Sequence, residues 1–287
     1  MTRIVYVNGR YVPYADAAVH VEDRGFQFAD AIYEVCEVRG GSLIDEARHM
    51  ARLERSLAEL QIRRPMSAAA LGHVMRQLIR RNRVRDGLVY LQVSRGAAPR
   101  DFSFPGPDVP PTVVCLAQSI SAAHRDLKAL SGIAVKSMPD IRWQRRDIKT
   151  VMLLPACLAK EAARKDGARE AWFVDAEGFV TEGASSNAWI IDQGGAVITR
   201  QLGLDILPGV TRATLLDVLA EEKMQLIERP FLLSEAYAAR EAFITSATQT
   251  VMPVVRIDGR PVGDGRPGPV AAKLRQKFHH FAAISSA

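Results

Sequence analysis

Lys149 is the residue of this sequence whose surroundings best suit chemistry on a carbonyl group. It ends the basic segment 142–149, which reads RWQRRDIK, and an apolar helical pattern follows it. Desolvation and neighbouring cations both favour the unprotonated form of an amine, and an unprotonated amine can attack an aldehyde to form a Schiff base. A solvated lysine beside an arginine-rich loop also explains this local sequence, and it is the commoner situation.

Glu182 opens a second segment of interest, in which small and hydroxylated residues follow a carboxylate. The segment 182–186 reads EGASS, and Asn187 follows it. Small side chains allow a ligand to approach the backbone closely. An ordinary hairpin and turn is the alternative interpretation of the same residues.

Two further segments are suited to bind a phosphate group. Leu207-Pro208-Gly209-Val210-Thr211 leads into a predicted helix, and a helix N-terminus offers free N–H groups and the positive end of the helix dipole. The segment 245–248 (TSAT) follows a predicted strand and offers hydroxyl groups. Many helices begin with threonine, and the second segment also fits a polar turn, so neither motif identifies a site by itself.

The N-terminal half contributes a polar segment and one arginine. Residues 22–30 read EDRGFQFAD, and Tyr33 follows them. Arg52 lies in a helical pattern beside apolar residues. An arginine in such a place either extends its charged end over apolar surface into solvent or clamps a phosphate.

The spacing of apolar residues predicts the elements that position these side chains. In the first half we expect hairpins that turn at Asn8-Gly9 and Gly40-Gly41, helices over 46–61 and 67–83, and strands over 89–94 and 112–118. In the second half we expect a strand near 132–136, a hairpin over 170–187, and helices near 153–166, 211–224 and 269–282. This mixed order predicts an α+β fold with an N-terminal domain over 1–120, an irregular linker over 121–131 and a C-terminal domain over 132–287.

Composition narrows the class of protein. The 287 residues are 48% hydrophobic and 24% charged, as in soluble globular proteins. The net charge of +6 has no nucleic-acid-binding motif beside it, so we expect no nucleic-acid partner but an electropositive site that attracts anionic ligands. No stretch is apolar enough for a membrane span or a secretory signal. The cysteines (Cys36, Cys115 and Cys157) lack metal-ligand spacing, so we expect reduced thiols, no bound metal and a cytoplasmic location.

Taken in chain order, these segments resemble the fold-type IV pyridoxal-phosphate (PLP) aminotransferases. That family includes D-amino-acid aminotransferase, the branched-chain aminotransferases and aminodeoxychorismate lyase. The resemblance runs nearly end to end and rests on features in the family's order, namely 23–28 (DRGFQF) with Tyr33, then Arg52, Lys149, Glu182, Val210-Thr211 and Ser246. The segments 140–143 (DIRW), 94–96 (SRG) and Pro99-Arg100 are most similar to D-amino-acid aminotransferase.

The resemblance implies a fold, an assembly and residue roles. The N-terminal domain would be α/β, the C-terminal domain a barrel-like α/β domain, and the protein a homodimer in which the loop near Arg100 reaches the partner's active site. Lys149 would hold PLP as a Schiff base and move the proton between Cα and C4′, and Glu182 would pair with the pyridinium nitrogen. The remaining matches would bind the phosphate (Arg52, Val210, Thr211, Ser246 and the Ala247 backbone), the ring (Leu207) and the substrate side of the site (Tyr33, Arg100, Phe102 and Arg142).

Two positions depart from the family pattern. A histidine usually stands where this chain has Phe102, which changes the group that binds the substrate carboxylate. A threonine usually stands where this chain has Ala247, so one phosphate-binding hydroxyl is missing.

The resemblance implies ping-pong transamination between a D-amino acid and a 2-oxo acid, for example D-alanine and 2-oxoglutarate. Related alternatives are an L-branched-chain or (R)-amine transaminase and a lyase of the aminodeoxychorismate type. A non-catalytic PLP-binding or nucleic-acid-binding protein is the alternative from another class. Retained Lys149 and Glu182 count against the first of these, and the lack of a nucleic-acid-binding motif counts against the second.

Overall fold

The computed structural model describes residues 3–285, and these divide into two compact units. Of the described residues, the first unit comprises 3–122, the short segment Ile148–Met152 and 283–285. The second comprises Ala123–Asp147 and Leu153–Ala282. Lys149 therefore belongs to the first unit, although in the sequence its segment lies between two stretches of the second unit.

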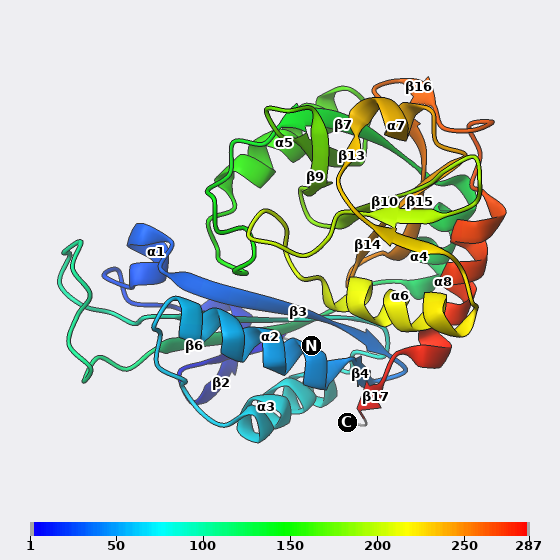
Figure 1. Cartoon of the computed structure of the whole chain (residues 1–287). Coiled ribbons are helices and arrows are strands. Elements are labelled where there is room, and N and C mark those ends of the chain that lie inside the picture. Colours follow the sequence, from blue (N-terminus) through cyan, green and yellow to red (C-terminus); the bar gives the residue numbers. More distant parts are fainter. Residues whose placement is uncertain (1–2, 286–287) are drawn as a thin grey trace. The chain divides into compact units, whose positions relative to one another are not determined.

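The first unit is built on one sheet (Figure 1). Its order is β17-β4-β3-β5-β6-β1-β2, with bounds β1 Ile4–Val7, β2 Arg10–Pro13, β3 Ala31–Arg39, β4 Ser42–Ile44, β5 Gly87–Ser94, β6 Thr112–Ser119 and β17 Ile284–Ser285. The predicted turn at Asn8-Gly9 is confirmed, since both residues have the positive φ angles (44° and 89°) that such a two-residue turn requires.

Helices α2 (Glu46–Glu59) and α3 (Ala68–Arg81) pack on this sheet, against β3 and against β1 and β6 respectively. Both were predicted, and the Ser67 side chain caps α3 by accepting a hydrogen bond from Ala70 N at 3.2 Å. The short helices α1 (Arg24–Phe28) and η1 (Tyr14–Asp16) were not predicted. The Asp23 carboxylate caps α1, so the polar segment 22–30 is a capped turn of helix.

The second unit contains a barrel-like sheet of order β12-β11-β10-β14-β15-β7-β8-β9-β13, with β16 beside β15 (Figure 1). The bounds are β7 Ile133–Pro139, β8 Glu170–Val174, β9 Phe179–Gly183, β10 Asn187–Ile191, β11 Val197–Thr199, β12 Leu226–Glu228, β13 Phe231–Leu232, β14 Glu241–Ser246, β15 Thr250–Ile257 and β16 Arg260–Pro261. A 2.7 Å hydrogen bond from Gly183 N to Ser186 O joins the last residue of β9 to the residue before β10.

Alternate residues of these strands build separate apolar cores. Trp172 packs with Phe231 among the strands, whereas its neighbour Phe173 packs against α5 (Leu154–Lys165). The helices α6 (Val210–Glu221) and α8 (Pro269–Phe281) cover another face, where the rings of Trp189 and Phe243 stack with centroids 5.5 Å apart. The remaining helices are α4 (Ala122–Ser131) and α7 (Leu233–Tyr237).

The predicted linker over 121–131 is wrong in character, because residues 122–131 form α4. Of these helical residues only Arg125 and Ala129 are buried, while Leu127 and Leu130 are exposed. Ala123, Leu127 and Leu130 do have helical spacing in the sequence, but in this unit the two leucines face solvent. Residues 148–152 and 283–285, which we assigned to the C-terminal domain, belong to the first unit.

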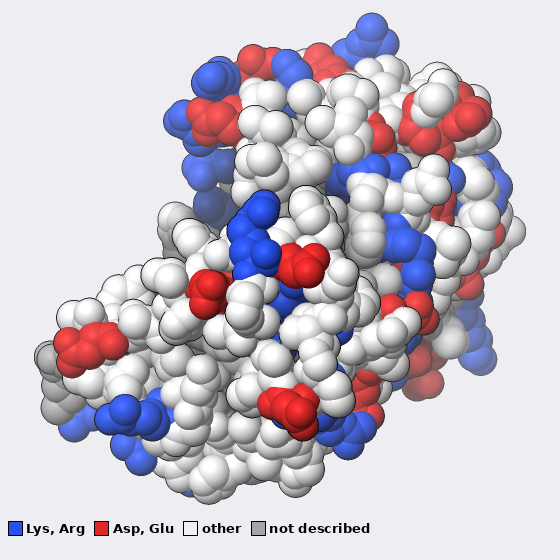
Figure 2. All heavy atoms as spheres, turned by 90° about the vertical axis from the view of Figure 1, so that its left-hand side faces the viewer, with Lys and Arg blue, Asp and Glu red and all other residues white. Residues whose placement is uncertain are grey.

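The charged surface is mixed where it can be seen. On the face in Figure 2, basic and acidic side chains lie in small neighbouring groups separated by uncharged surface. Within residues 3–285, no helix is both long and apolar enough to cross a membrane. All three cysteines are free, with Cys36 and Cys115 buried and Cys157 exposed.

A buried ion pair ties α2 to β3 in the first unit. Glu34 accepts hydrogen bonds from Arg52 Nε at 2.8 Å and Nη2 at 2.7 Å, and His49 Nδ1 lies 2.7 Å from the same carboxylate. Burial opposes ionisation of Glu34, but the Arg52 charge and hydrogen bonds, together with His49, outweigh it and lower the pKa to about 2. The carboxylate is therefore ionised throughout the physiological range.

We expect Glu34→Gln to lower the free energy of unfolding at pH 7 by about 3 kcal/mol, because Arg52 then stays buried without its counter-charge. The folded pKa is about 2 and the ordinary value is 4.5. The contribution of Glu34 is thus complete above the ordinary value and is lost as the pH falls through the folded value. Urea unfolding of wild type and variant at pH 7, 5 and 3 measures this, with exposed Glu161→Gln as the control. A difference that stays constant with pH would contradict the assignment.

Candidate functional site

Lys149 lies at the edge of the first unit's sheet. Its segment runs beside the start of β3, with hydrogen bonds from Tyr33 N to Lys149 O at 3.0 Å and from Val151 N to Ala31 O at 3.1 Å. This pairing places the Lys149 amine 4.0 Å from the centroid of the Tyr33 ring. The two residues predicted to serve the reacting end of the site are thus neighbours within one unit.

The Tyr33 ring is itself held by its neighbours on the sheet. It stacks on Tyr90 of β5 with centroids 5.7 Å apart and an interplanar angle of 28°. The Tyr90 hydroxyl donates to Gln92 Oε1 at 2.6 Å. Burial, with a smaller effect of Tyr33, raises the pKa of Tyr90 to about 12, so its hydroxyl remains a donor at neutral pH.

Arg52 lies on α2, where the resemblance predicts a phosphate-binding role. The Glu34 carboxylate orients its guanidinium through the two bonds described above, so this buried arginine does not simply extend into solvent. One helical turn further on, Ser56 Oγ is 3.5 Å from the backbone N of Lys149. Arg52 and Ser56 share one face of α2 because they are four residues apart.

Arg100 and Phe102 lie in the loop between β5 and β6, and their contacts are with α1. The Arg100 guanidinium is 5.1 Å from the centroid of the Phe28 ring, and Phe102 meets that ring edge-on at 5.6 Å. The Phe102 side chain is 81% exposed. The loop is anchored by Arg24, whose Nη1 donates to Asp101 O at 2.6 Å. Within the described part of the first unit, these contacts do not bring Arg100 to Tyr33 or Lys149.

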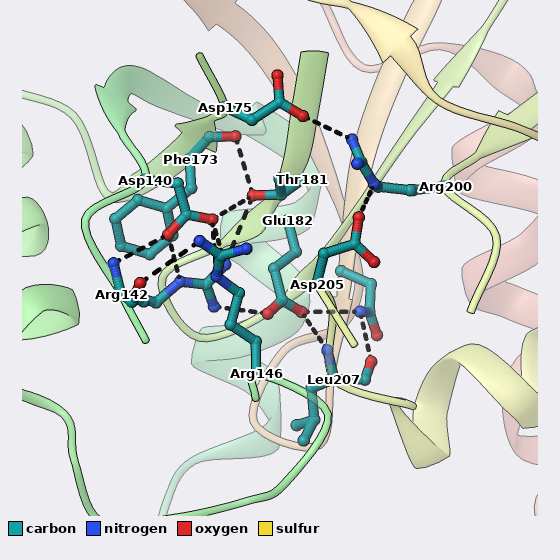
Figure 3. Close-up of polar contacts among 11 residues, drawn as sticks. Asp140, Arg142, Arg146, Phe173, Asp175, Thr181, Glu182, Arg200, Asp205 and Leu207 are labelled. Carbon is teal, nitrogen blue, oxygen red and sulfur yellow. Dashed lines mark hydrogen bonds and ion pairs between the residues drawn. The ribbon is translucent and has the colours of Figure 1, made fainter. Parts of the chain in front are cut away.

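Glu182 ends a strand of the second unit as a buried, fully oriented carboxylate (Figure 3). Its Oε1 accepts from Arg142 Nη1 at 2.6 Å, and its Oε2 accepts from Asn187 Nδ2 and Leu207 N, both at 3.1 Å. Burial raises the pKa of Glu182, and the Arg142 charge and hydrogen bond with the Leu207 amide only partly offset that rise. A carboxylate has about four lone-pair positions, so three donors leave room for one more.

Arg142 was predicted on the substrate side of the site, and it contacts Glu182 directly. Its guanidinium lies 4.3 Å over the Phe173 ring and also binds the buried Asp140. Asp140 follows β7, whereas Glu182 belongs to β9, so Arg142 joins two strands of the sheet.

The segment 200–209 connects this carboxylate to the start of α6. Asn187 Nδ2 also donates to Leu207 O at 3.0 Å, and Arg200 pairs with Asp175 and with Asp205 of the same segment (Figure 3). Two residues after Leu207, Gly209 begins α6 without a side-chain cap. A Cβ atom at Gly209 would lie 2.1 Å from Asn187 Oδ1, so only glycine fits this approach.

The start of α6 carries Val210 and Thr211, and both are buried. Ser246 ends β14, and its hydroxyl lies 3.1 Å from Thr248 Oγ1 and accepts from Gln249 N at 3.2 Å. Ala247 is half-buried in the same turn. Asn187 of β10 pairs with Thr245 of β14, so the Ser246 turn and the Glu182 contacts belong to adjacent strands.

Three side chains that orient the predicted residues were not found from the sequence. They are Glu34, which orients Arg52, and Asp140 and Asn187, which orient Arg142 and Glu182. Asn187 directly follows the EGASS segment, and Glu34 directly follows Tyr33. Their position next to a predicted site residue was the one sequence feature that could have indicated an orienting role. Asp140 offered the same signal, two residues before Arg142.

Comparison with known proteins identifies the family. The family model for class IV amino-transferases matches residues 31–257. A D-alanine aminotransferase of Staphylococcus haemolyticus is 38% identical over 277 residues, which cover 96% of this chain and 97% of that protein. A D-alanine aminotransferase of Bacillus licheniformis is 36% identical over 271 residues, covering 94% of each.

Solved structures agree on the fold. The branched-chain amino acid aminotransferase of Escherichia coli matches with a TM-score of 0.88 at 23% identity, over 98% of this chain and 94% of that one. The branched-chain aminotransferase of the archaeon Thermoproteus uzoniensis, solved with norvaline, matches with a TM-score of 0.87 at 22% identity, over 99% of each chain. The two-domain α+β architecture expected from the sequence is therefore confirmed, and the chain belongs to the class IV aminotransferase family.

Proposed function

We propose that this protein is a PLP-dependent transaminase that exchanges an amino group between a D-amino acid and a 2-oxo acid by a ping-pong mechanism. The geometric observation that carries the proposal is the connection, within the second unit, of a buried carboxylate to an uncapped helix start through Leu207. The substrate class is supported by the near full-length similarity to proteins named D-alanine aminotransferases. The solved structures named as branched-chain enzymes are below 25% identical in sequence, so they support the fold and not the substrate.

The second unit's residues fit the two anchoring ends of PLP. Glu182 has one acceptor position left for the N–H of a pyridinium ring. The start of α6 offers backbone N–H groups and the Thr211 hydroxyl to a phosphate, as helix N-termini do elsewhere. Ser246 would add a hydroxyl, Ala247 a backbone N–H, and Leu207 an apolar contact to the ring. Arg52 of the first unit would add charge to the phosphate.

PLP, when bound, supplies an aldehyde that condenses with amines and a ring that accepts electron density from the substrate. Lys149 would supply the amine that holds the aldehyde and later carries the proton between Cα and C4′. Glu182 would keep the ring nitrogen protonated by charge pairing. Tyr33 lies against the Lys149 amine and would bound the space in which the substrate binds.

We also propose a cytoplasmic homodimer in which the Arg100 loop contributes to the site of the partner. Phe26 of α1 and Phe102 and Phe104 of this loop are 77%, 81% and 58% exposed. Grouped exposed aromatic rings mark interaction surfaces more often than chance placement does. Arg100 is exposed beside them, and no carboxylate within residues 3–285 forms an ion pair with it, so its charge is available to a substrate carboxylate.

The proposed function is tested with Lys149→Ala. We expect purified wild type to be yellow and to transfer amino groups from D-alanine to 2-oxoglutarate, and the variant to lose both the colour and the turnover. Alanine made from pyruvate should be the D enantiomer by chiral chromatography. Exposed Lys165→Ala is the matched control. Full turnover in Lys149→Ala would refute the lysine assignment, and predominantly L-alanine from wild type would favour the branched-chain alternative.

Gly209→Ala should weaken cofactor binding. The added methyl group would displace Asn187, which bonds both Glu182 and Leu207 O. Overpacking of this kind costs about 1–3 kcal/mol, so we expect a rise of roughly tenfold in the PLP dissociation constant. Fluorescence titration of the apoprotein measures this constant. Gly106→Ala is the control, because nothing lies within 4 Å of its Cβ position. Equal PLP dissociation constants in the two variants would contradict a cofactor-binding role for the start of α6.

Phe102→His should raise kcat/KM for D-alanine and lower any activity on (R)-1-phenylethylamine. A histidine gives a carboxylate a charge-assisted hydrogen bond, which contributes about 1.5–3 kcal/mol, or roughly tenfold or more. The exposed ring of Phe102 contributes little packing, so the substitution should be tolerated. Steady-state kinetics on both substrates, with Phe26→His as the control, provide the test. If kcat/KM for D-alanine does not rise, position 102 does not bind the substrate carboxylate in this way.

A further inference from the structure

Asp140 is a buried carboxylate to which the proposed function assigns no part. Its side chain has no solvent exposure. Oδ1 accepts from Arg142 Nε at 2.9 Å and Oδ2 from Arg142 Nη2 at 2.8 Å, which is a two-point contact (Figure 3). The Thr181 hydroxyl donates to Oδ2 at 2.8 Å, and Arg146 Nε lies 3.4 Å from the same atom.

These contacts determine where Arg142 can point. A two-point contact fixes the plane of a guanidinium, and the Phe173 ring covers one side of that plane at 4.3 Å. The remaining terminal nitrogen, Nη1, then meets Glu182 Oε1 at 2.6 Å. Arg142 cannot rotate toward the second oxygen of Glu182 without breaking both bonds to Asp140. Oε2 is therefore left to the weaker neutral donors Asn187 and Leu207.

Asp140 also divides the charge of Arg142. The guanidinium faces two carboxylates, one on each side, and Arg146 supplies a second positive charge next to Asp140. Burial acts against the ionised form of Asp140, but the hydrogen bonds and charge of Arg142, then Thr181 and Arg146, outweigh it and hold the pKa of Asp140 below its usual value. Asp140 is thus a permanent negative charge beside the Arg142–Glu182 pair.

We propose that Asp140 is a positioning residue for the cofactor site: it holds Arg142 in one orientation and draws part of its charge away from Glu182, so that Glu182 keeps an acceptor position and enough basicity to hold a proton on the ring nitrogen of bound PLP. The inference rests on the proposed function. Thr181, directly before Glu182 in β9, ties Asp140 to the strand that carries Glu182.

Asp140→Asn tests the inference, because it keeps the size of the side chain and removes its charge. Loss of a nearby negative charge makes neighbouring groups more acidic. The pH midpoint at which the absorbance of bound PLP changes should therefore move down by about one unit, which corresponds to a tenfold change in proton affinity. Cofactor should still bind, as measured by fluorescence titration of the apoprotein. We expect kcat to fall about tenfold while KM changes little.

Two comparisons separate positioning from stability. Glu241→Gln alters an equally buried carboxylate of the second unit, whose oxygens accept from Val270 N and Ala271 N at the start of α8. It should lower the melting temperature of the apoprotein without moving the absorbance midpoint. Thr181→Val removes the hydroxyl that contacts Asp140, together with its longer contacts to Phe173 O and Arg142 Nη2, and keeps both carboxylates. It should move the midpoint in the same direction by a smaller amount, and this test remains if Asp140→Asn does not fold.

The outcomes distinguish the inference from the function beneath it. A midpoint that moves down in Asp140→Asn and Thr181→Val but not in Glu241→Gln supports the positioning role. If Asp140→Asn folds and binds PLP with an unchanged midpoint, the inference alone is overturned. If Asp140→Asn does not fold, an unchanged midpoint in PLP-bound Thr181→Val overturns it in the same way. A wild-type protein that shows no PLP absorbance after incubation with the cofactor would overturn the proposed function, and the inference with it.

Discussion

The sharing of one guanidinium by two buried carboxylates is the interaction that fixes the Glu182 carboxylate in the second unit. Arg142 binds Asp140 at two points and Glu182 at one, and Phe173 covers its face. Three charged groups withdrawn from water are costly unless each is paired and hydrogen-bonded. Here each of them is, and the chain connects them to strands β7 and β9. The direction of the Glu182 carboxylate is therefore a property of the sheet and is set before any ligand arrives.

The first unit also contains a buried ion cluster, but there one carboxylate contacts two basic side chains instead of one arginine contacting two carboxylates. There the buried Glu34 carboxylate is contacted by Arg52 and His49, so one carboxylate is the shared partner of two basic side chains. An arginine fixed by a carboxylate suits a residue expected near a phosphate, and a carboxylate fixed by an arginine suits a residue expected near a pyridinium. The two units thus provide complementary electrostatic environments by the same device, a buried ion cluster between a strand and its neighbour.

Local features of the fold could be predicted from the sequence, whereas the groups that orient the site could not. The Asn8-Gly9 turn, the Ser67 cap and the apolar stripe of α2 act over a few residues, so a single sequence contains all the necessary information. Lys149 and Glu182 each have ordinary local surroundings, and only their order along the chain singled them out. The orienting role of Asp140 depends on its contact with Thr181, which is 41 residues away in the sequence and lies close to it only in the folded sheet. Helix α4 was missed for a different reason, since polar residues dominate its sequence and hid the helical spacing of Ala123, Leu127 and Leu130.

The strand order of the first unit places β17, a strand formed late in the sequence, at the edge of its sheet. β17 pairs with β4, with Ile284 opposite Ile44, and Ala283 N donates to Asp45 Oδ1 at 3.0 Å. A ribosome that has finished the first 122 residues has therefore made most of the sheet but neither its last strand nor the Lys149 segment. The nascent unit would expose the open edge of β4 until β17 is made, and that edge is a place where a chaperone or a second nascent chain can pair. Removal of β17 would leave Lys149 and Glu182 in the chain but this edge permanently open.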